Sequence, residues 1–183
     1  MAERLRSAAH GALRTPASPT LALAIQTGPR VPAIGVSRAR LRRWVLAALQ
    51  SDARITLRFV GAAEGRALNR AYRGKDYATN VLTFSYPADE TGTTMPATAA
   101  DIVICVPVVT REARAQRKPW DHHLAHLVIH GVLHAQGLEH DDEVQAQAME
   151  ALETALLRRF RIADPYGEPA RPAGRGGSTD RAA

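Results

Sequence analysis

The chain has 183 residues and a net charge of +6, from 24 basic and 18 acidic side chains, which fits one ordinary domain or one smaller domain with loose ends. No run reaches the roughly 18 apolar residues of a transmembrane helix, and the single cysteine, Cys105, excludes an intrachain disulfide and indicates a reducing compartment. We therefore expect a cytoplasmic protein that does not bind membranes.

Apolar periodicity predicts strands and helices along the middle of the chain. The expected strands are residues 21–25, 55–59, 80–84 and 101–106. The expected helices are residues 37–50, 62–72, 107–117, 121–136 and 142–160. These elements indicate a single α+β domain over residues 20–163, with disordered segments at 1–19 and 164–183.

The basic residues and the last helix give two further expectations. Nearly all basic residues are arginines, because only Lys75 and Lys118 are lysines. An arginine-rich surface suits phosphate recognition, although it also fits an ordinary solvated surface. The expected apolar face of the last helix comprises Val144, Ala148, Leu152, Ala155 and Leu156.

Three histidines near residue 130 have the spacing of metal ligands. His130 and His134 are four residues apart, so on a helix they share one face and can bind one ion at about 2.0–2.1 Å. Gly137 can take the left-handed conformation that ends a helix, and the turn can bring His140 to the same ion. Three neutral imidazoles with an open fourth position are typical of a catalytic zinc site, whereas a structural site is closed by four protein ligands.

Other residues around this site narrow the interpretation. His126 shares the same helix face, but about 12 Å of helix separates it from His134, which is too far for a shared ion. We expect His126 to be a core residue or to support a ligand, and His122 and His123 to lie on the surface. The spacing equals the H-E-x-x-H-x-x-G-x-x-H motif of metzincin proteases, but Gly131 replaces their glutamate general base. The sequence therefore favours another kind of hydrolysis.

Two motifs resemble one known family. The segment 130–140, H-G-V-L-H-A-Q-G-L-E-H, is similar to the signature H-G-x-L-H-x-x-G-x-D-H of the YbeY family of ribosomal-RNA maturation endoribonucleases. Residues 69–84 resemble that family's N-x-x-Y-R-x-K-D-x-x-T-N-V-L-S-F motif. The resemblance covers roughly residues 20–166. Glu139 stands where the family usually has Asp, and Ala100 stands where a Gly is common.

The resemblance implies a small α+β fold with a mixed sheet of about four strands, packed with about five helices and carrying a zincin-like histidine site on a helix. It implies one zinc ion per chain, held by His130, His134 and His140, and endoribonuclease activity specific for single strands. It also implies a role in maturing the 3′ end of 16S ribosomal RNA and in ribosome quality control. The implied partners are single-stranded ribosomal RNA, the small subunit with its proteins, and an Era-type ribosome-assembly GTPase.

Metal-assisted phosphodiester hydrolysis is the expected reaction. Arg73 inherits the family's proposed functional arginine, and we expect it to bind the phosphate together with Lys75. Glu139 is the second catalytic candidate, to orient a ligand or take a proton. Either a zinc-bound water or the RNA 2′-hydroxyl can be the nucleophile, and three imidazoles also suit nickel, copper or iron.

Two other functions stay open at this stage. One is a non-catalytic ribosome-assembly factor whose zinc only shapes a docking surface. The other is a zinc peptidase, which Gly131 disfavours because glycine cannot move a proton.

Overall fold

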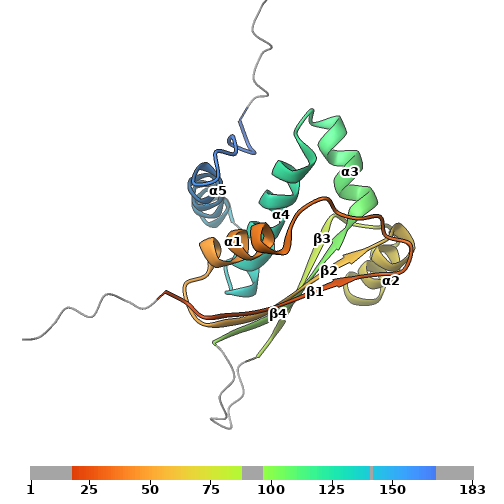
Figure 1. Cartoon of the computed structure of the whole chain (residues 1–183), viewed down its shortest axis with the longest axis horizontal. Helices are drawn as coiled ribbons and strands as arrows, with labels where there is room; N and C mark the ends of the chain where they lie inside the picture. The colour runs from red at the N-terminus through yellow and green to blue at the C-terminus, as the bar shows by residue number, and fades with distance from the viewer. Residues whose placement is uncertain (1–17, 88–96, 141, 168–183) are drawn as a thin grey trace, which may run out of the picture.

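The computed structural model describes residues 18–87, 97–140 and 142–167 (Figure 1). Within these residues there are four strands: β1 (Leu21–Thr27), β2 (Ala53–Val60), β3 (Val81–Tyr86) and β4 (Thr98–Cys105). There are five helices: α1 (Arg38–Ala48), α2 (Ala62–Arg73), α3 (Val106–Ala115), α4 (Trp120–Ala135) and α5 (Glu143–Arg158). Each element lies where the sequence predicted one, and the α+β class is confirmed.

The described strands form a mixed sheet in the order β1-β2-β4-β3. β1 runs parallel to β2 and β2 runs parallel to β4, whereas β3 pairs antiparallel with β4 and forms one edge. Alternation along β2 gives the sheet two different faces. Ile55, Leu57 and Phe59 are fully buried on one face, and Arg54 and Arg58 lie on the other.

The helices cover these two faces unequally (Figure 1). Helices α1, α4 and α5 pack on the face that carries the main core, and α4 contacts both β3 and β4. On the other face, Leu68 of α2 packs against a smaller cluster that includes Val103 and Cys105. Cys105 is therefore a buried core residue, as predicted. Ala22 and Ala24, on the same face of β1, are exposed, so α2 covers only the part of this face nearest β3 and β4.

Gly131 lets α4 lie directly on the sheet. A Cβ atom at this position would lie 2.8 Å from Cγ2 of Ile102 and 3.2 Å from Oγ1 of Thr83. The Thr83 hydroxyl also donates a hydrogen bond to the carbonyl of Gly131 at 3.3 Å. The glycine that stands in place of the protease glutamate therefore has a packing role, because a side chain here would push α4 away from β3 and β4.

We expect Gly131→Ala to lower the free energy of unfolding by about 1–3 kcal/mol, the usual cost of forcing an extra group into a packed core. Ile102 branches at Cβ, so its Cγ2 cannot swing aside without moving the rest of the side chain. Urea denaturation measures the change. Gly61→Ser is the control, because nothing lies within 4 Å of a Cβ added there and serine is a good N-cap. A Gly131→Ala protein as stable as the wild type would contradict this packing argument.

The predicted apolar face of α5 is confirmed only in part, because Leu152 and Leu156 pack against the core but the other three residues are exposed. Val144 is 77% exposed, although it belongs to the expected face. The residues that α5 buries are Met149, Glu153, Thr154, Leu156 and Leu157. The buried face therefore includes Glu153, which hydropathy alone places in solvent.

Two further predictions need correction. His123 does not lie on the surface: its side chain is only 5% exposed, and its Nε2 is 2.9 Å from Oε2 of Glu112. The tail expected from residue 164 overlaps the described fold, because Asp164 accepts a hydrogen bond from Thr154 and Tyr166 packs against His126. The other residues of the two predicted disordered segments, apart from 18–19, lie outside the described part of the chain.

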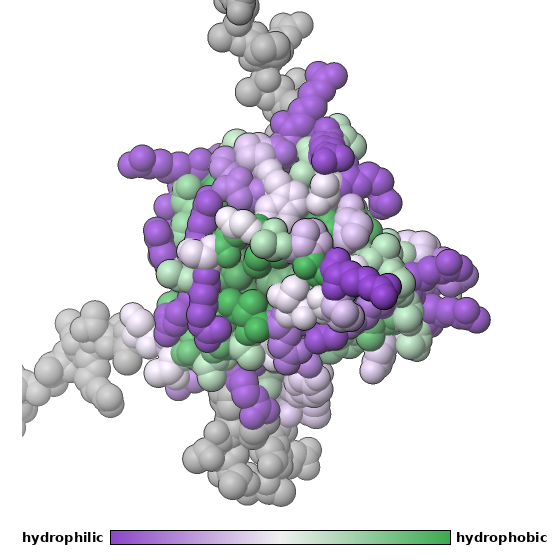
Figure 2. All heavy atoms as spheres, turned by 45° about the vertical axis from the view of Figure 1, so that its right-hand side comes forward, coloured by the Kyte–Doolittle hydropathy of each residue, from purple (hydrophilic) through white to green (hydrophobic). Residues whose placement is uncertain are grey.

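Hydrophilic side chains project around the face seen in Figure 2, and apolar residues gather over a smaller central area. None of the helices in the described residues is both long enough and apolar enough to cross a bilayer.

Candidate metal centre and active site

The last turn of α4 and the loop after it bring three histidines together. His130 and His134 lie on α4, and Gly137 then turns the chain with a φ of +85°. The backbone N–H groups of Gly137 and Leu138 bond back to His134 and Leu133, which fixes this turn. As a result, one ring nitrogen from each of His130, His134 and His140 lies within 4.8 Å of the others.

The spacing of these nitrogens fits a single ion. Two nitrogens bound to one tetrahedral zinc at about 2.0–2.1 Å are about 3.4 Å apart, and Nε2 of His130 is 3.1 Å from Nε2 of His134. The ring of His140 completes the group, with its centroid 5.0 Å from that of His134 and 5.7 Å from that of His130. The donor set of three imidazoles on one side suits a divalent transition metal.

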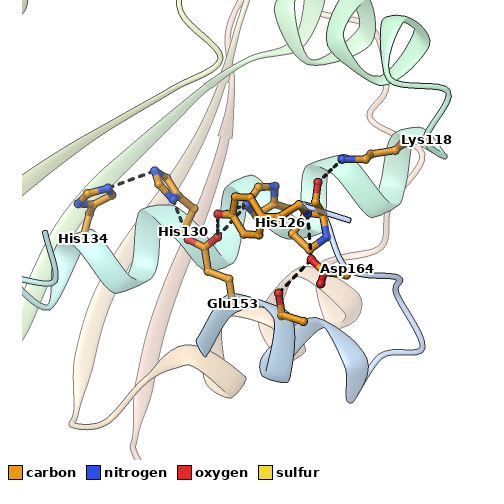
Figure 3. Close-up of polar contacts among 9 residues, drawn as sticks. Lys118, His126, His130, His134, Glu153 and Asp164 are labelled. Atoms are coloured by element: carbon orange, nitrogen blue, oxygen red, sulfur yellow. Dashed lines mark hydrogen bonds and ion pairs between the residues drawn. The ribbon is translucent and has the colours of Figure 1, made fainter. Parts of the chain in front are cut away.

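A buried carboxylate fixes the orientation of His130. Oε1 of Glu153 lies 2.7 Å from Nδ1 of His130, and the Glu153 side chain is fully buried. Figure 3 shows His134, His130 and Glu153 in a row, with His126 on the far side of the carboxylate. When the Nδ1–H of His130 donates a hydrogen bond to Glu153, Nε2 carries a lone pair that faces His134. Metal-binding histidines are commonly held in this way.

Glu153 accepts more than one hydrogen bond. Its Oε2 lies 2.8 Å from Nε2 of His126 and also accepts from the hydroxyl of Tyr166. Burial alone would raise the pKa of Glu153, but the hydrogen bonds from His126, His130 and Tyr166 outweigh it and lower the pKa from 4.5 to about 2. The carboxylate is therefore charged at neutral pH in spite of its burial.

The environment of His134 also favours a neutral ring. Burial lowers the pKa of His134, and the neighbouring His130 lowers it further. A carboxylate oxygen of Glu139 lies 3.4 Å from Nδ1 of His134. Glu139 thus sits beside the nitrogen that does not face His130.

The histidines open into a cleft of about 560 Å³ between α4, the end of α2 and β3. Arg73 is the last residue of α2, and Gly74 ends that helix in the left-handed conformation. The residues that line the cleft are Tyr72, Arg73, Thr79, Asn80, Val81, Leu82, Thr83, Phe84, Ser85, His130, His134, Glu139 and His140.

The structure brings five of the six predicted site residues into this cleft. Arg73, Glu139 and the three histidines all line it. Lys75 does not: it is exposed and lies two residues beyond the end of α2. The geometry therefore gives Lys75 no contact with the centre.

Asn80, which belongs to the motif at residues 69–84, also lines the cleft. Its Oδ1 accepts from the backbone N–H of Val81 at 2.7 Å, and its Nδ2 donates to Oε2 of Glu112 at 3.0 Å. The same oxygen of Glu112 contacts His123. Both ends of the Asn80 amide are occupied, so Asn80 holds the start of β3 against α3 and α4.

The fold and this site together define a small α+β protein with a three-histidine centre at the edge of a mixed sheet. A family model described as Endoribonuclease YbeY matches residues 34–161. A protein named Endoribonuclease YbeY from Cupriavidus pinatubonensis is 53% identical over 161 residues, which are 86% of this chain and 78% of that protein. One of the same name from Methylibium petroleiphilum is 50% identical over 154 residues, 84% of this chain and 99% of that protein.

The chain therefore belongs to the YbeY endoribonuclease family. A solution structure of a Thermotoga maritima protein matches 79% of this chain and 99% of its own, with 21% identity and a TM-score of 0.46. That match adds nothing to the assignment, which rests on the sequence relatives.

Proposed function

We propose that the chain is a metal-dependent endoribonuclease that cleaves single-stranded RNA at the cleft between α2, β3 and α4. His130, His134 and His140 would hold one zinc ion. The observation that carries the proposal is the hydrogen bond from Nδ1 of His130 to the buried Glu153, because it leaves Nε2 free to bind a metal beside the nitrogens of His134 and His140.

A bound zinc ion would lower the pKa of a coordinated water to about 7 and polarise a phosphoryl oxygen. The chain's own groups do the remaining work. Arg73 holds the scissile phosphate by charge-assisted hydrogen bonds from the mouth of the cleft. Glu139, whose carboxylate oxygen lies 3.4 Å from Nδ1 of His134, would help to orient that ring.

The proposed partners are RNA and proteins of ribosome assembly. The family name carries an RNA substrate, and the chain has 24 basic residues against 18 acidic ones, which suits a polyanion. We place the function in the cytoplasm, at the 3′ end of 16S ribosomal RNA. The small subunit and an Era-type GTPase are the expected partners.

Arg73→Ala tests the phosphate contact. We expect RNA cleavage to fall by about 10- to 100-fold, because a hydrogen bond to a charged group contributes about 1.5–3 kcal/mol. Zinc content and melting temperature should not change, because Arg73 is an exposed residue at a helix end. The measurement is the rate of cleavage of a labelled single-stranded RNA, with metal analysis of the same preparations.

Arg70→Ala is the matched control for Arg73→Ala. Arg70 lies on the same helix, is exposed and does not line the cleft. Equal losses in the two variants would mean that general positive charge on α2, and not a contact at the centre, supports cleavage.

A 2′,3′-cyclic phosphate product, together with no cleavage of DNA, would identify the 2′-hydroxyl as the nucleophile.

A further inference from the structure

We propose that the RNA strand continues from the cleft that contains the three histidines (the metal cleft) over the edge of β3 onto the opposite face of the sheet. There its bases stack on Tyr72 and Tyr86. This inference rests on the proposed function, since it assigns a second part of the binding site to the same substrate. Its occupant is single-stranded RNA.

A second cleft adjoins the metal cleft on the other side of β3. It has a volume of about 400 Å³ and lies over the sheet face that α2 covers in part. Tyr72, Phe84 and Ser85 line both clefts. Because β3 is an edge strand, a chain that leaves the histidines can cross it without passing through the core.

The pairing register arranges this face in rows. Tyr86 of β3 and Arg54 of β2 both pair with Ala99 of β4, so the three residues form one row across the sheet. In the next row, Phe84 and Thr56 flank Asp101. The aromatic residues thus line the edge strand, and the arginine lies two strand spacings away, about 9.5 Å.

Two tyrosines at this face, Tyr72 and Tyr86, have large exposed surfaces that do not pack in a hydrophobic core. Tyr72 is 68% exposed and Tyr86 is 50% exposed. The ring of Tyr72 lies 4.7 Å from that of Phe84, centroid to centroid, at an angle of 60°. The hydroxyl of Tyr86 donates to Asp101 at 2.7 Å, which fixes its ring. Exposed rings held in place are suited to base stacking, which tolerates any sequence.

The charges fit a strand whose bases face the sheet. The acids on this face are engaged: Glu64 pairs with Arg58 at 2.6 Å, and Asp101 accepts from Tyr86. Asp101 can also accept from an exocyclic amino group of a base. Phosphates would then point outward, toward Arg54 on β2 and Arg73 at the end of α2. A double helix keeps its bases stacked inside, so this face selects single strands.

Binding of RNAs of two lengths tests the inference. The protein is the zinc-loaded wild type or a tyrosine variant of it, the RNA is 12 nucleotides long with its 2′-hydroxyls methylated to slow cleavage, and the readout is fluorescence anisotropy. We expect Tyr72→Ala and Tyr86→Ala each to raise the Kd for the 12-nucleotide RNA by about 5- to 100-fold. The Kd for a 3-nucleotide RNA, which reaches only the metal cleft, should change less than twofold in Tyr86→Ala.

Two matched variants separate stacking from other effects. Tyr86→Phe keeps the ring and should bind within about twofold of the wild type, whereas a loss as large as that of Tyr86→Ala would overturn the stacking. Tyr77→Ala removes a tyrosine that is 59% exposed but lines neither cleft, and should not change the Kd. Wild-type Kd values in both alanine variants would overturn the inference.

Cross-linking of the wild-type protein covers the case in which an alanine variant fails to fold. RNA of 12 nucleotides with 4-thiouridine at successive positions should cross-link to peptides that contain Tyr72 or Tyr86, and cross-links confined to other peptides would overturn the inference. A wild-type dimer that excludes RNA from this face would also overturn it. Cleavage that persists without metal would instead count against the proposed function, whatever the Kd values are.

Discussion

His134→Ala is expected to abolish stoichiometric zinc binding and to slow RNA cleavage by at least about a thousandfold. Two of the three ring nitrogens would remain, and two imidazoles do not complete the three-ligand set of a catalytic zinc site. A metal that stabilises transition-state charge contributes several kcal/mol, and each 1.36 kcal/mol is a factor of ten in rate. Metal analysis and single-turnover cleavage of the same preparation measure both effects.

The control for His134→Ala is another histidine on the same helix. His122 lies near the start of α4, is half-buried and does not line the cleft. We expect His122→Ala to keep its zinc and its cleavage rate within about twofold. If His134→Ala loses its metal but cleaves RNA at the wild-type rate, the cleavage belongs to a contaminating nuclease or to a site that does not use the metal.

The meeting of the three histidines could be predicted because its geometry is local. His130 and His134 are four residues apart on one helix, and Gly137 and His140 follow in the loop directly after that helix. Helix geometry and a single left-handed residue are enough to place the three rings, and no distant contact is needed. The prediction that these rings converge is confirmed by the distances between their nitrogens.

Glu153 and His123 could not be placed from sequence for the opposite reason. Glu153 is 23 residues from His130 and lies on another helix. Its burial depends on donors from His126 and His130 of α4 and from Tyr166 after α5, which meet only when α5 and the segment after it pack against α4. His123 is buried because Glu112 of α3 meets it. In both cases, hydropathy assigns a polar side chain to solvent, and a tertiary hydrogen bond overrides that assignment.

The grouping of Tyr86 and Arg54 on the sheet face that α2 covers in part depends on strand register, which is also a tertiary feature. Tyr86 and Arg54 are 32 residues apart and face the same side only because both pair with Ala99. The sequence predicts each strand, but strand order and register come from the assembled sheet. The sequence alone therefore does not connect Tyr86 and Arg54 with the cleft that contains the histidines.

Glu153→Ala should weaken both the fold and the metal site. Removing one partner of a buried charged network typically costs about 3–5 kcal/mol of stability. The loss of a carboxylate that orients a metal-binding histidine typically weakens metal affinity by about 10- to 100-fold. Urea denaturation of the metal-free protein gives the first effect, and competition for zinc with a chelator gives the second.

Glu153→Gln separates charge from packing in the same experiment. Glutamine keeps the volume of the side chain but carries no charge, so it should retain more stability than alanine and still bind zinc more weakly than the wild type. Glu150→Gln is the control, because Glu150 lies one turn earlier on α5 and is exposed. Weakened zinc affinity in Glu150→Gln would mean that the overall charge of α5, and not the contact with His130, sets the affinity.

Glu153 should also make the stability of the fold depend on pH in the acid range. The pKa of Glu153 is lowered from 4.5 to about 2 in the folded protein, so its charge stabilises the fold fully above pH 4.5. That contribution is lost as the pH falls from 4.5 toward 2, because the folded state then has to take up a proton that the unfolded state already carries. We expect the metal-free wild type to lose stability steeply across this window and Glu153→Gln to lose less. Parallel acid curves for the two proteins would contradict the network that joins Glu153 to His126 and His130.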